Sequence, residues 1–326
     1  MRRLIRTAII ACAVIASCAL SRPLSTAETT AQASAIPFTP AKNLLLIGWD
    51  GVQWSHLNEL LEAGKLPNLA KLKADGALAH ISITDHKTCT KPGWAQINSG
   101  LSAKASGISS NAEYRPMPAG ATIFERLEDL SAHAVFTGFI AGKSHHIGSA
   151  GPNVSFKVRG KAVSTGEGEP WYLSRAGFDI WLGDTHRTAD EVGGLLIGML
   201  REYAPHNRFA IFAHFGDPDS AGHRSGENSV EYEDAIIACD NWLGTITARL
   251  ERLGVLEDTL VVVVTDHGFD EGAKQHNDAP DAFFAVNDAR RKYHEGDMLD
   301  ITPTILTLLG VPGATFSTLP GKALWE

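Results

Sequence analysis

Two fully apolar runs each lead directly to an aspartate, and no other feature of this 326-residue chain restricts its fold so strongly. Residues 44–47 read Leu-Leu-Leu-Ile shortly before Asp50, and residues 260–264 read Leu-Val-Val-Val-Val shortly before Asp266. Neither run alternates with polar residues, so both predict strands that are buried on both faces. An unpaired charge at the end of such a strand would cost several kcal/mol, so each aspartate needs a partner. An α/β sheet commonly builds a metal site from side chains placed in this way.

The rest of the chain alternates between strand-like and helix-like segments. Strands are expected at residues 43–48, 77–84, 134–139, 209–215 and 260–265. Helices are expected at residues 57–75, with a break near Pro67, and at 92–99, 122–130, 189–203, 230–253 and 301–309. Strands that alternate with helices form βαβ units. We therefore predict an α/β fold, a three-layer sandwich whose mostly parallel central sheet is covered by helices on both faces.

Residues 1–27 are predicted to be a bacterial export signal. Three arginines precede the apolar stretch at residues 7–20, and the small residues 25–27 suit a cleavage site. The apolar stretch is too short for a good transmembrane span, so we expect a periplasmic or secreted protein without one. Residues 15–18, Ile-Ala-Ser-Cys, also resemble a lipoprotein cleavage site, which leaves a lipid anchor at Cys18 as the alternative.

Beyond the signal, residues 28–42 have the small residues and prolines of a flexible tail. Residues 43–326 are expected to form a single catalytic domain, in which the irregular segment around 148–181 would be a lid or insertion. The whole chain has a net charge of −8, and the predicted signal contributes only positive charge. So acidic a protein is a poor candidate for a stable complex with nucleic acid.

Three groups of potential metal ligands lie far apart in the sequence. They are Asp50, the pair Asp219 and His223, and the group Asp266, His267 and His276. Together with the hydroxyl of Thr90 they are enough for two divalent metal ions. Oxygen mixed with imidazole nitrogen suits Zn²⁺ best, with Mn²⁺ or Fe as alternatives, whereas a Ca²⁺ site would use oxygen alone. Each group also has an ordinary explanation by itself: a turn after a strand, an exposed loop or, for Thr90, a helix cap.

The order of these residues resembles the alkaline phosphatase superfamily, and the local sequences resemble its type I phosphodiesterase and nucleotide pyrophosphatase branch. The stretches that carry the resemblance are Gly48-Trp49-Asp50-Gly51, Thr90-Lys91-Pro92 through Ser99-Gly100-Leu101, Asp219 to His223, Thr265-Asp266-His267-Gly268 and the closing residues 300–306. The resemblance implies that Asp219, His223 and His276 hold one ion. It also implies that Asp50, Asp266 and His267 hold the other, with Thr90 bridging toward it. The implied reaction is attack by Thr90, a phosphothreonine intermediate and its hydrolysis by water.

The resemblance implies roles for further residues. Asn111 matches the family's asparagine that donates to a non-bridging phosphate oxygen, although an Asx-turn would also explain it. Lys143-Ser144-His145 resembles the Gly-Lys-x-His element of sulfatases and the lysine of some threonine-using alkaline phosphatases. Diesterases of the nucleotide pyrophosphatase type generally lack this lysine. A fixed cation suits a dianionic monoester, and a solvated loop lysine is the alternative.

A phosphodiesterase or nucleotide pyrophosphatase that acts on a small-molecule phosphoester is therefore the expected function. A phosphomonoesterase that uses Lys143 is the main alternative. Sulfatases make their nucleophile from Cys or Ser in Cys-x-Pro-x-Arg, whereas this chain has Thr90 two residues before Pro92, and Gly93-Trp94 follow. Cys89 is out of register by one residue, so sulfatase activity is disfavoured. A phosphonate hydrolase and a non-catalytic binding relative remain as further alternatives.

Overall fold

The computed structural model describes residues 38–112, 117–144, 146–147 and 177–325, together with the backbone of residues 155–158 and 161–164. The predicted export signal, Cys18 and the larger part of the predicted tail lie outside these residues. So do His145 and most of the predicted lid around 148–181. The described residues belong to one compact unit, Pro37–Glu326.

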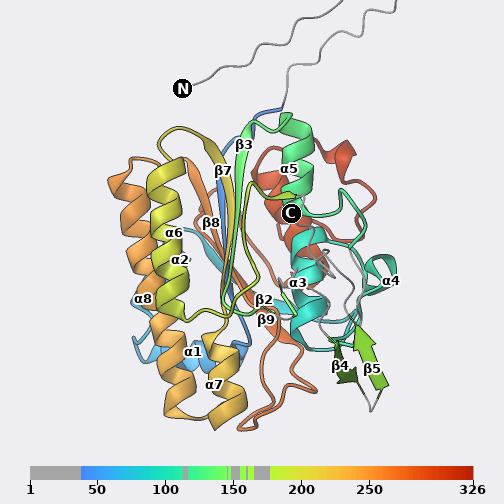
Figure 1. The fold of residues 1–326 in the computed structure, drawn as a ribbon. Helices are drawn as coiled ribbons and strands as arrows, with labels where there is room; N and C mark the ends of the chain where they lie inside the picture. Colours follow the sequence, from blue (N-terminus) through green and yellow to red (C-terminus); the bar gives the residue numbers. More distant parts are fainter. Residues whose placement is uncertain are drawn as a thin grey trace, which may run out of the picture. The chain divides into compact units, whose positions relative to one another are not determined.

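The centre of this unit is an eight-stranded sheet with the strand order β10-β2-β9-β8-β1-β7-β3-β6 (Figure 1). The strands are β1 (Asn43–Trp49), β2 (Ala77–Ser82), β3 (Val135–Ala141), β6 (Ile180–Leu182), β7 (Arg208–Phe215), β8 (Thr259–Val264), β9 (Asp281–Val286) and β10 (Gly296–Asp297). Neighbouring strands pair in parallel except at β9, which runs antiparallel to both β2 and β8. The predicted mostly parallel sheet is therefore confirmed, and β1 lies between β7 and β8.

Helices cover both faces of the sheet. They are α1 (Trp54–Glu62), α2 (Pro67–Asp75), α3 (Thr90–Ser99), α4 (Ala103–Ser106), α5 (Ile123–Ser131), α6 (Ala189–Tyr203), α7 (Asp217–Ser225), α8 (Val230–Arg252) and α9 (Ile301–Leu308), with short 3-10 turns at Met298–Asp300 and Gly313–Thr315. In Figure 1, α1, α2, α6, α7 and α8 lie on one side of the sheet, and α3 and α5 lie on the other. Two apolar cores match these sides, because Leu44 and Leu46 of β1 pack into one and Leu45 and Ile47 into the other. The predicted three-layer sandwich is confirmed.

Local sequence signals explain where several helices begin and end. Thr122 and Thr188 each form a capping box with a glutamate three residues later, at the starts of α5 and α6. Pro67 occupies the first turn of α2, after the predicted break. Gly100 ends α3 in the left-handed conformation, with φ 67°. Because these signals are local, the predicted ends of these helices lie close to the observed ones.

Other elements were not predicted. The stretch around Asp219 and His223, for which an exposed loop was one explanation, is the helix α7, so that explanation is wrong. The segment expected to be irregular contains β6 and a two-stranded hairpin of β4 (Ser155–Val158) and β5 (Lys161–Ser164). The apolar residues of β9 had no assignment, and this strand is the antiparallel member of the sheet.

The two cysteines of this unit are poor candidates for a nucleophile because both are buried. Cys89 and Cys239 are both buried free thiols, and burial raises the pKa of the Cys89 thiol to about 11. A thiol with so high a pKa forms little thiolate and is a poor nucleophile.

Among the helices of the described residues, none is long and apolar enough to cross a membrane.

Candidate active site

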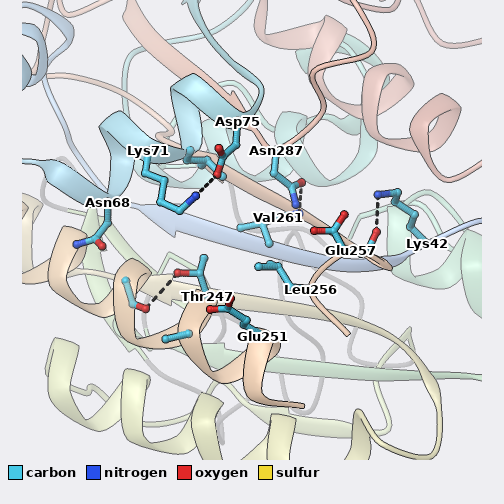
Figure 2. Close-up of a pocket in the computed structure, with 13 residues that line it drawn as sticks. Lys42, Asn68, Lys71, Asp75, Thr247, Glu251, Leu256, Glu257, Val261 and Asn287 are labelled. Carbon is cyan, nitrogen blue, oxygen red and sulfur yellow. Dashed lines mark hydrogen bonds and ion pairs between the residues drawn. The ribbon is translucent and has the colours of Figure 1, made fainter. Parts of the chain in front are cut away.

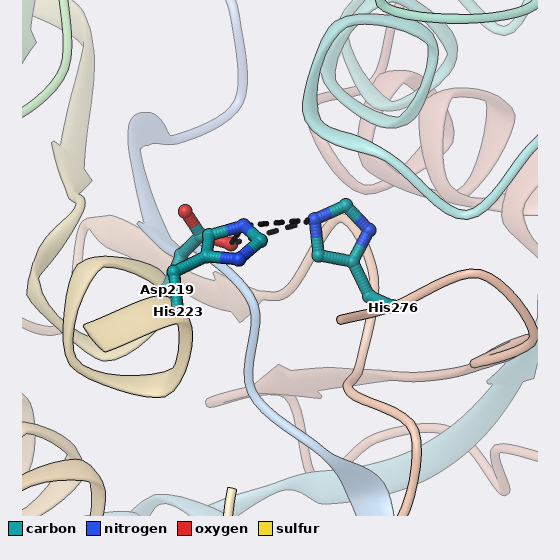
Figure 3. Close-up of side chains that lie close together, drawn as sticks. All are labelled: Asp219, His223 and His276. Atoms are coloured by element: carbon teal, nitrogen blue, oxygen red, sulfur yellow. Dashed lines mark hydrogen bonds and ion pairs between the residues drawn. The ribbon is translucent and has the colours of Figure 1, made fainter. Parts of the chain in front are cut away.

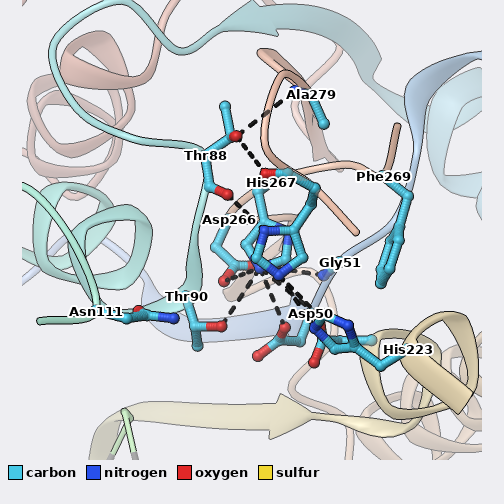
Figure 4. A network of polar contacts seen from close by, with 12 residues as sticks. Asp50, Gly51, Thr88, Thr90, Asn111, His223, Asp266, His267, Phe269 and Ala279 are labelled. Carbon is cyan, nitrogen blue, oxygen red and sulfur yellow. Dashed lines mark hydrogen bonds and ion pairs between the residues drawn. The ribbon is translucent and has the colours of Figure 1, made fainter. Parts of the chain in front are cut away.

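The predicted metal ligands gather at the carboxyl ends of neighbouring strands. Asp50 follows β1 directly, Asp266 follows β8 after one residue, and Asp219 lies in the first turn of α7, which begins soon after β7. Because β1 pairs in parallel with both β7 and β8, these ends meet at one edge of the sheet. Figure 4 shows side chains from these distant stretches converging on one place.

An outer group of ligands consists of Asp219, His223 and His276, whose ligand atoms all lie within 4.8 Å of one another (Figure 3). Asp219 and His223 are one helical turn apart on α7, so their side chains lie on the same face. The Nε2 atoms of His223 and His276 are 3.1 Å apart, and Oδ1 of Asp219 lies 3.4 Å from Nε2 of His223. The structure thus brings together the residues expected to hold the first ion.

The three predicted histidine ligands share one hydrogen-bonding arrangement. Each ring bonds through Nδ1 to a backbone carbonyl: His223 to Lys274 at 2.8 Å, His267 to Gly268 at 2.9 Å and His276 to Thr88 at 2.6 Å. A carbonyl oxygen only accepts, so each Nδ1 carries a proton and each neutral ring has its lone pair on Nε2. Histidine ligands of metal ions are commonly oriented by such bonds.

A second, deeper group of candidate ligands is more buried than the outer group. The ligand atoms of Asp50, Asp219 and His267 lie within 4.8 Å of one another. The Nε2 atom of His267 is 3.6 Å from Oδ1 of Asp50 and 3.5 Å from Oδ2 of Asp266. The resemblance assigns Asp50, Asp266 and His267 to the second ion. The structure places these three together and adds Asp219, which contributes to both groups.

Two carboxylate oxygens in this centre are buried and accept no hydrogen bond from any described residue. They are Oδ1 of Asp219 and Oδ2 of Asp266. A ring whose Nδ1 proton is held by a backbone carbonyl directs a lone pair, in its neutral form, and not a proton toward these oxygens. Converging lone pairs in a buried space repel one another unless a cation lies between them. The residues therefore fit a divalent metal ion with mixed oxygen and imidazole ligands.

Buried charges in the deeper group shift one another's pKa values. Burial favours the neutral form of Asp50, but the ammonium of Lys143, the hydrogen bond from His214 and the nearby ring of His267 together outweigh burial and hold the pKa of Asp50 well below its usual range. Burial and the charge of Asp50 raise the pKa of Asp266 well above its usual range. Burial lowers the pKa of His267 to about 3, and the repulsion that two protonated rings would feel so close together, His267 and His276, acts in the same direction. The ring of His267 is therefore neutral near pH 7, as a metal ligand must be.

Thr90 is the first residue of α3, and its hydroxyl lies 3.3 Å from Nε2 of His267. Cys89 occupies the N-cap position of this helix, and no side chain makes a capping bond there. The explanation of Thr90 as a helix cap is therefore wrong. Its hydroxyl instead faces the deeper group from a helix N-terminus, where backbone N–H groups favour a bound anion.

Asn111 lies beside the start of α3. Its Oδ1 accepts a hydrogen bond from the backbone N–H of Lys91 at 2.8 Å, and its backbone carbonyl accepts one from Nζ of Lys91 at 3.0 Å. Because the amide oxygen faces Lys91, the amide NH₂ group points elsewhere, and Figure 4 shows it directed toward Thr90. This geometry suits the donor role that the resemblance implies.

Lys143 follows β3 and reaches into the ligand groups. Its ammonium donates to Oδ1 of Asp50 at 2.9 Å and to Asp219, and its side chain is 7 % exposed. Burial alone would lower the pKa of Lys143, but these carboxylates raise it. The explanation of Lys143 as a solvated loop lysine is therefore wrong. His145 lies outside the described residues, so its role stays a prediction.

His214, on β7, is a site residue that the sequence did not reveal. Its Nε2 lies 2.8 Å from Oδ2 of Asp50, and its Nδ1 accepts a hydrogen bond from the N–H of Gly142 at 3.3 Å. The ring therefore donates its Nε2 proton to Asp50 and orients that carboxylate. Burial lowers the pKa of His214, which keeps the ring neutral. Its signal in the sequence was a histidine within the apolar run at residues 209–215.

A cavity of about 360 Å³ opens beside these ligands. Its lining comprises Thr90, Asn111, Lys143, His146, His186, Asp219, Ser220, His223 and His276. A larger cavity of about 600 Å³ lies away from the ligands, between α2 and α8 (Figure 2). Its described lining contains no histidine, and Lys71 there is already paired with Asp75. The smaller cavity is therefore the candidate for binding a substrate.

Comparison with protein families gives a match over most of the chain. The model described as type I phosphodiesterase / nucleotide pyrophosphatase matches residues 44–309. This range extends from β1 through α9, so it includes all the predicted metal ligands, Thr90 and Asn111.

Individual relatives are more distant. Ectonucleotide pyrophosphatase/phosphodiesterase family member 7 from Mus musculus is 21% identical over 253 residues, which are 74% of this chain and 53% of that protein. The Homo sapiens protein of the same name is 22% identical over 246 residues, which are 72% of this chain and 49% of that protein. The chain thus spans about half the length of these curated relatives.

Among solved structures, the protein yidJ from Bacteroides fragilis, assigned as a sulfatase, has a similar fold. The TM-score is 0.59 at 17% sequence identity, and the match covers 88% of this chain and 77% of that one. At so low an identity the likeness concerns the fold, and it agrees with the alkaline phosphatase-like architecture expected from the sequence.

Proposed function

The chain belongs to the type I phosphodiesterase/nucleotide pyrophosphatase family, and from this premise we propose that it is a metal-dependent phosphoric ester hydrolase that acts through Thr90. The observation that carries the proposal is the convergence of histidine lone pairs and unsatisfied carboxylate oxygens beside the hydroxyl of Thr90. Two adjacent groups of ligands support two divalent ions. Their mixed nitrogen and oxygen atoms favour Zn²⁺.

The ligands divide between the ions as the resemblance implies. One set is Asp219, His223 and His276, and the other is Asp50, Asp266 and His267. When bound, two divalent ions lower the pKa of a nearby hydroxyl and neutralise charge on phosphoryl oxygens. The backbone carbonyls keep the histidines in the tautomer that presents Nε2, and His214 holds Asp50 in position.

Thr90 is the nucleophile in the proposed reaction. Its hydroxyl gives its proton to solvent, its oxygen bonds to phosphorus, and the bond from phosphorus to the leaving group breaks. The leaving group departs with the bonding electrons and takes up a proton from water, and a phosphothreonine remains. The amide of Asn111 donates to a non-bridging oxygen and stabilises the charge that develops there. Water then hydrolyses the phosphothreonine and regenerates Thr90.

A phosphodiester is the proposed substrate class. A monoester carries an additional negative oxygen, for which Lys143 was the candidate cation. In this structure the ammonium of Lys143 is already in contact with two carboxylates, Asp50 and Asp219. The charge of Lys143 is therefore engaged by ligand carboxylates and is not free to compensate the additional negative oxygen of a monoester. A phosphomonoesterase is therefore the second candidate rather than the first.

A sulfatase, a phosphonate hydrolase and a non-catalytic relative are the other candidate functions on this fold. Sulfatase activity is disfavoured because Thr90 cannot be oxidised to the formylglycine aldehyde. A phosphonate hydrolase would use the same ligands and the same threonine. A non-catalytic relative would keep the fold but would have lost ligands or Thr90, and this chain retains them.

We also propose that the protein is exported by residues 1–27, with lipidation at Cys18 as the alternative. Mass spectrometry of the mature protein tests this directly. A chain that begins near residue 28 supports cleavage without a lipid, and a lipid-bearing Cys18 at the N-terminus supports the alternative. A mature chain that still contains residues 1–27 would contradict both.

A substrate panel with metal analysis tests the proposed activity. The full chain, purified without chelator, is assayed with added Zn²⁺ on p-nitrophenyl phosphate, bis-p-nitrophenyl phosphate, p-nitrophenyl sulfate and a phosphonate. We expect the highest kcat/KM for the diester, about two ions per chain by elemental analysis, and loss of activity after chelation. A higher kcat/KM for the monoester would favour the phosphomonoesterase. Active protein without Zn, Mn or Fe would exclude the metal-dependent mechanism.

A further inference from the structure

Lys143 connects the outer and deeper ligand groups. Its Nζ donates to Asp50, which belongs to the deeper group, and to Asp219, which belongs to both. The three side chains are 7 %, 0 % and 5 % exposed, respectively. Because water barely reaches them, the ammonium supplies the charge compensation that solvent supplies at a protein surface.

The backbone around Lys143 holds the side chain in this position. The N–H of Gly142 donates to the carbonyl of His214 at 2.8 Å, and the N–H of Arg187 donates to the carbonyl of Gly142 at 2.8 Å. A Cβ atom at Gly142 would lie 2.7 Å from the backbone nitrogen of Gly216, and a Cβ atom at Gly216 would lie 2.9 Å from Cγ of Lys143. Glycine permits these close approaches, so the end of β3 and the start of α7 enclose the lysine side chain.

We propose that Lys143 is an internal counter-cation of the metal centre, which holds Asp50 and Asp219 together before an ion binds and limits how tightly the ion then binds. The proposal rests on the metal-dependent function proposed above. Lys143 uses Oδ2 of Asp219, whereas Oδ1 of the same carboxylate and Oδ2 of Asp266 accept no hydrogen bond from any described residue. Ligand oxygens therefore stay available while the lysine remains in place.

This role has two measurable consequences. Replacing Lys143 by an uncharged residue leaves two buried carboxylates without their cation, so the metal-free protein should lose stability. The same change removes a positive charge beside a divalent ion, so the ion should bind more tightly. If Lys143 only contacted substrate, its replacement would change neither the stability of the metal-free protein nor the Zn²⁺ affinity. If Lys143 only maintained the structure, its replacement would lower both.

The test compares wild-type protein with Lys143→Met, both as the full chain and both at about pH 8. Thermal unfolding is followed without metal, and Zn²⁺ affinity is measured by competition with a chromophoric chelator. We expect the Tm of metal-free Lys143→Met to fall by about 5 °C or more. We expect its Zn²⁺ affinity to rise about tenfold or more. If Lys143→Met does not fold, Lys143→Gln, whose amide can donate to one carboxylate, is measured in the same way.

Lys91→Met is the matched control. Lys91 is also a buried lysine, and its ammonium donates to the backbone carbonyl of Asn111 at 3.0 Å. Its replacement should lower Tm without a comparable gain in Zn²⁺ affinity. An equal gain in both variants would show that the effect does not belong to Lys143 and would overturn the proposal.

An unchanged Tm, or a Zn²⁺ affinity in Lys143→Met that is unchanged or weaker, would also overturn the proposal. Failure of the proposed function gives a different result, in which the wild-type protein binds no Zn²⁺. That result would overturn the part of the proposal that concerns ion affinity. The Tm of metal-free Lys143→Met independently decides whether the lysine holds the two carboxylates together.

Discussion

The outer and deeper ligand groups share Asp219 but differ in how much water reaches them. In the outer group the side chains of His223 and His276 are 41 % and 14 % exposed. In the deeper group, three residues are 0 % exposed: Asp50, Asp266 and His267. Solvent can stabilise a charge in the outer group, whereas each charge in the deeper group needs a partner within the protein. This is why Asp50 contacts both Lys143 and His214.

The two groups also differ in what supports them. The deeper group lies directly at strand ends in the middle of the sheet, whereas His276 comes from a loop. Glu227 stabilises that loop, because it accepts a hydrogen bond from the N–H of Gly272 at 3.0 Å and contacts His56 at 2.7 Å. A site with exposed ligands on a loop should exchange its ion readily. A buried site at strand ends should tolerate the loss of a ligand poorly.

The largest expected effect concerns Thr90, which faces the deeper group. Thr90→Ala should lower kcat by about a thousandfold or more while the fold remains intact, because the variant cannot form the covalent bond. Steady-state kinetics on bis-p-nitrophenyl phosphate and circular dichroism measure the two properties. Thr90→Ser is the control and should keep partial activity. A near wild-type rate in Thr90→Ala would indicate direct attack by water and would contradict the role of Thr90 as the nucleophile beside the deeper group.

The next effect compares one ligand from each group. Asp266→Ala should lower activity about a hundredfold or more, and added Zn²⁺ should not restore it, because a neutral water in the buried space does not supply the negative charge of the carboxylate. His276→Ala should lower the Zn²⁺ affinity of the outer group about ten- to a hundredfold. Excess Zn²⁺ should restore activity because water can occupy the exposed position. Activity is measured against Zn²⁺ concentration, with elemental analysis of each variant. Equal recovery of both variants would show that burial does not distinguish the groups.

A smaller effect is expected from His214, which supports only the deeper group. His214→Phe removes the hydrogen bond to Asp50 and should weaken Zn²⁺ binding at one site about ten- to a hundredfold. His214→Gln can still present a donor near the position of Nε2 and should recover part of the affinity. Zn²⁺ titration with a chromophoric chelator resolves the two sites. An affinity loss confined to the weaker, exchangeable site would contradict the assignment of His214 to the deeper group.

The smallest expected effect is on the pH dependence of metal-free stability. The folded pKa of His267 is about 3 and its usual value is 6.5, so between these values the unfolded chain binds a proton that the folded ring does not. Stability therefore falls as pH falls through this window, by up to about 1.4 kcal/mol per pH unit from this residue. Asp266, with its raised pKa, acts in the opposite direction because its folded form binds a proton first.

His267→Gln removes this titration and should flatten the fall in stability toward acid. Urea unfolding in the presence of a chelator, at about pH 7, 6 and 5, measures the slope. A slope that His267→Gln leaves unchanged would show that burial does not keep this ring neutral.

Much of the fold could be predicted from the sequence because its signals are local. The apolar runs at 44–47 and 260–264 identified two central strands, and capping residues and prolines defined helix ends. The candidate ligand residues could also be named from the sequence, because a charge directly after a buried strand needs a partner wherever that partner comes from. The antiparallel strand β9 was not predicted, since an apolar run of this length indicates neither a strand as opposed to a helix nor the direction in which it pairs.

The partners themselves were decided by the tertiary structure. His214 and Asp50 are separated by 164 residues, and they meet because β7 pairs with β1 in the register that places His214 opposite Gly48. Lys143 reaches Asp50 and Asp219 because β3 pairs with β7 on the next position of the sheet. The sequence determined which charges would be buried. Which groups neutralise them depended on strand order and register, and those follow from packing of the whole sheet rather than from any local pattern.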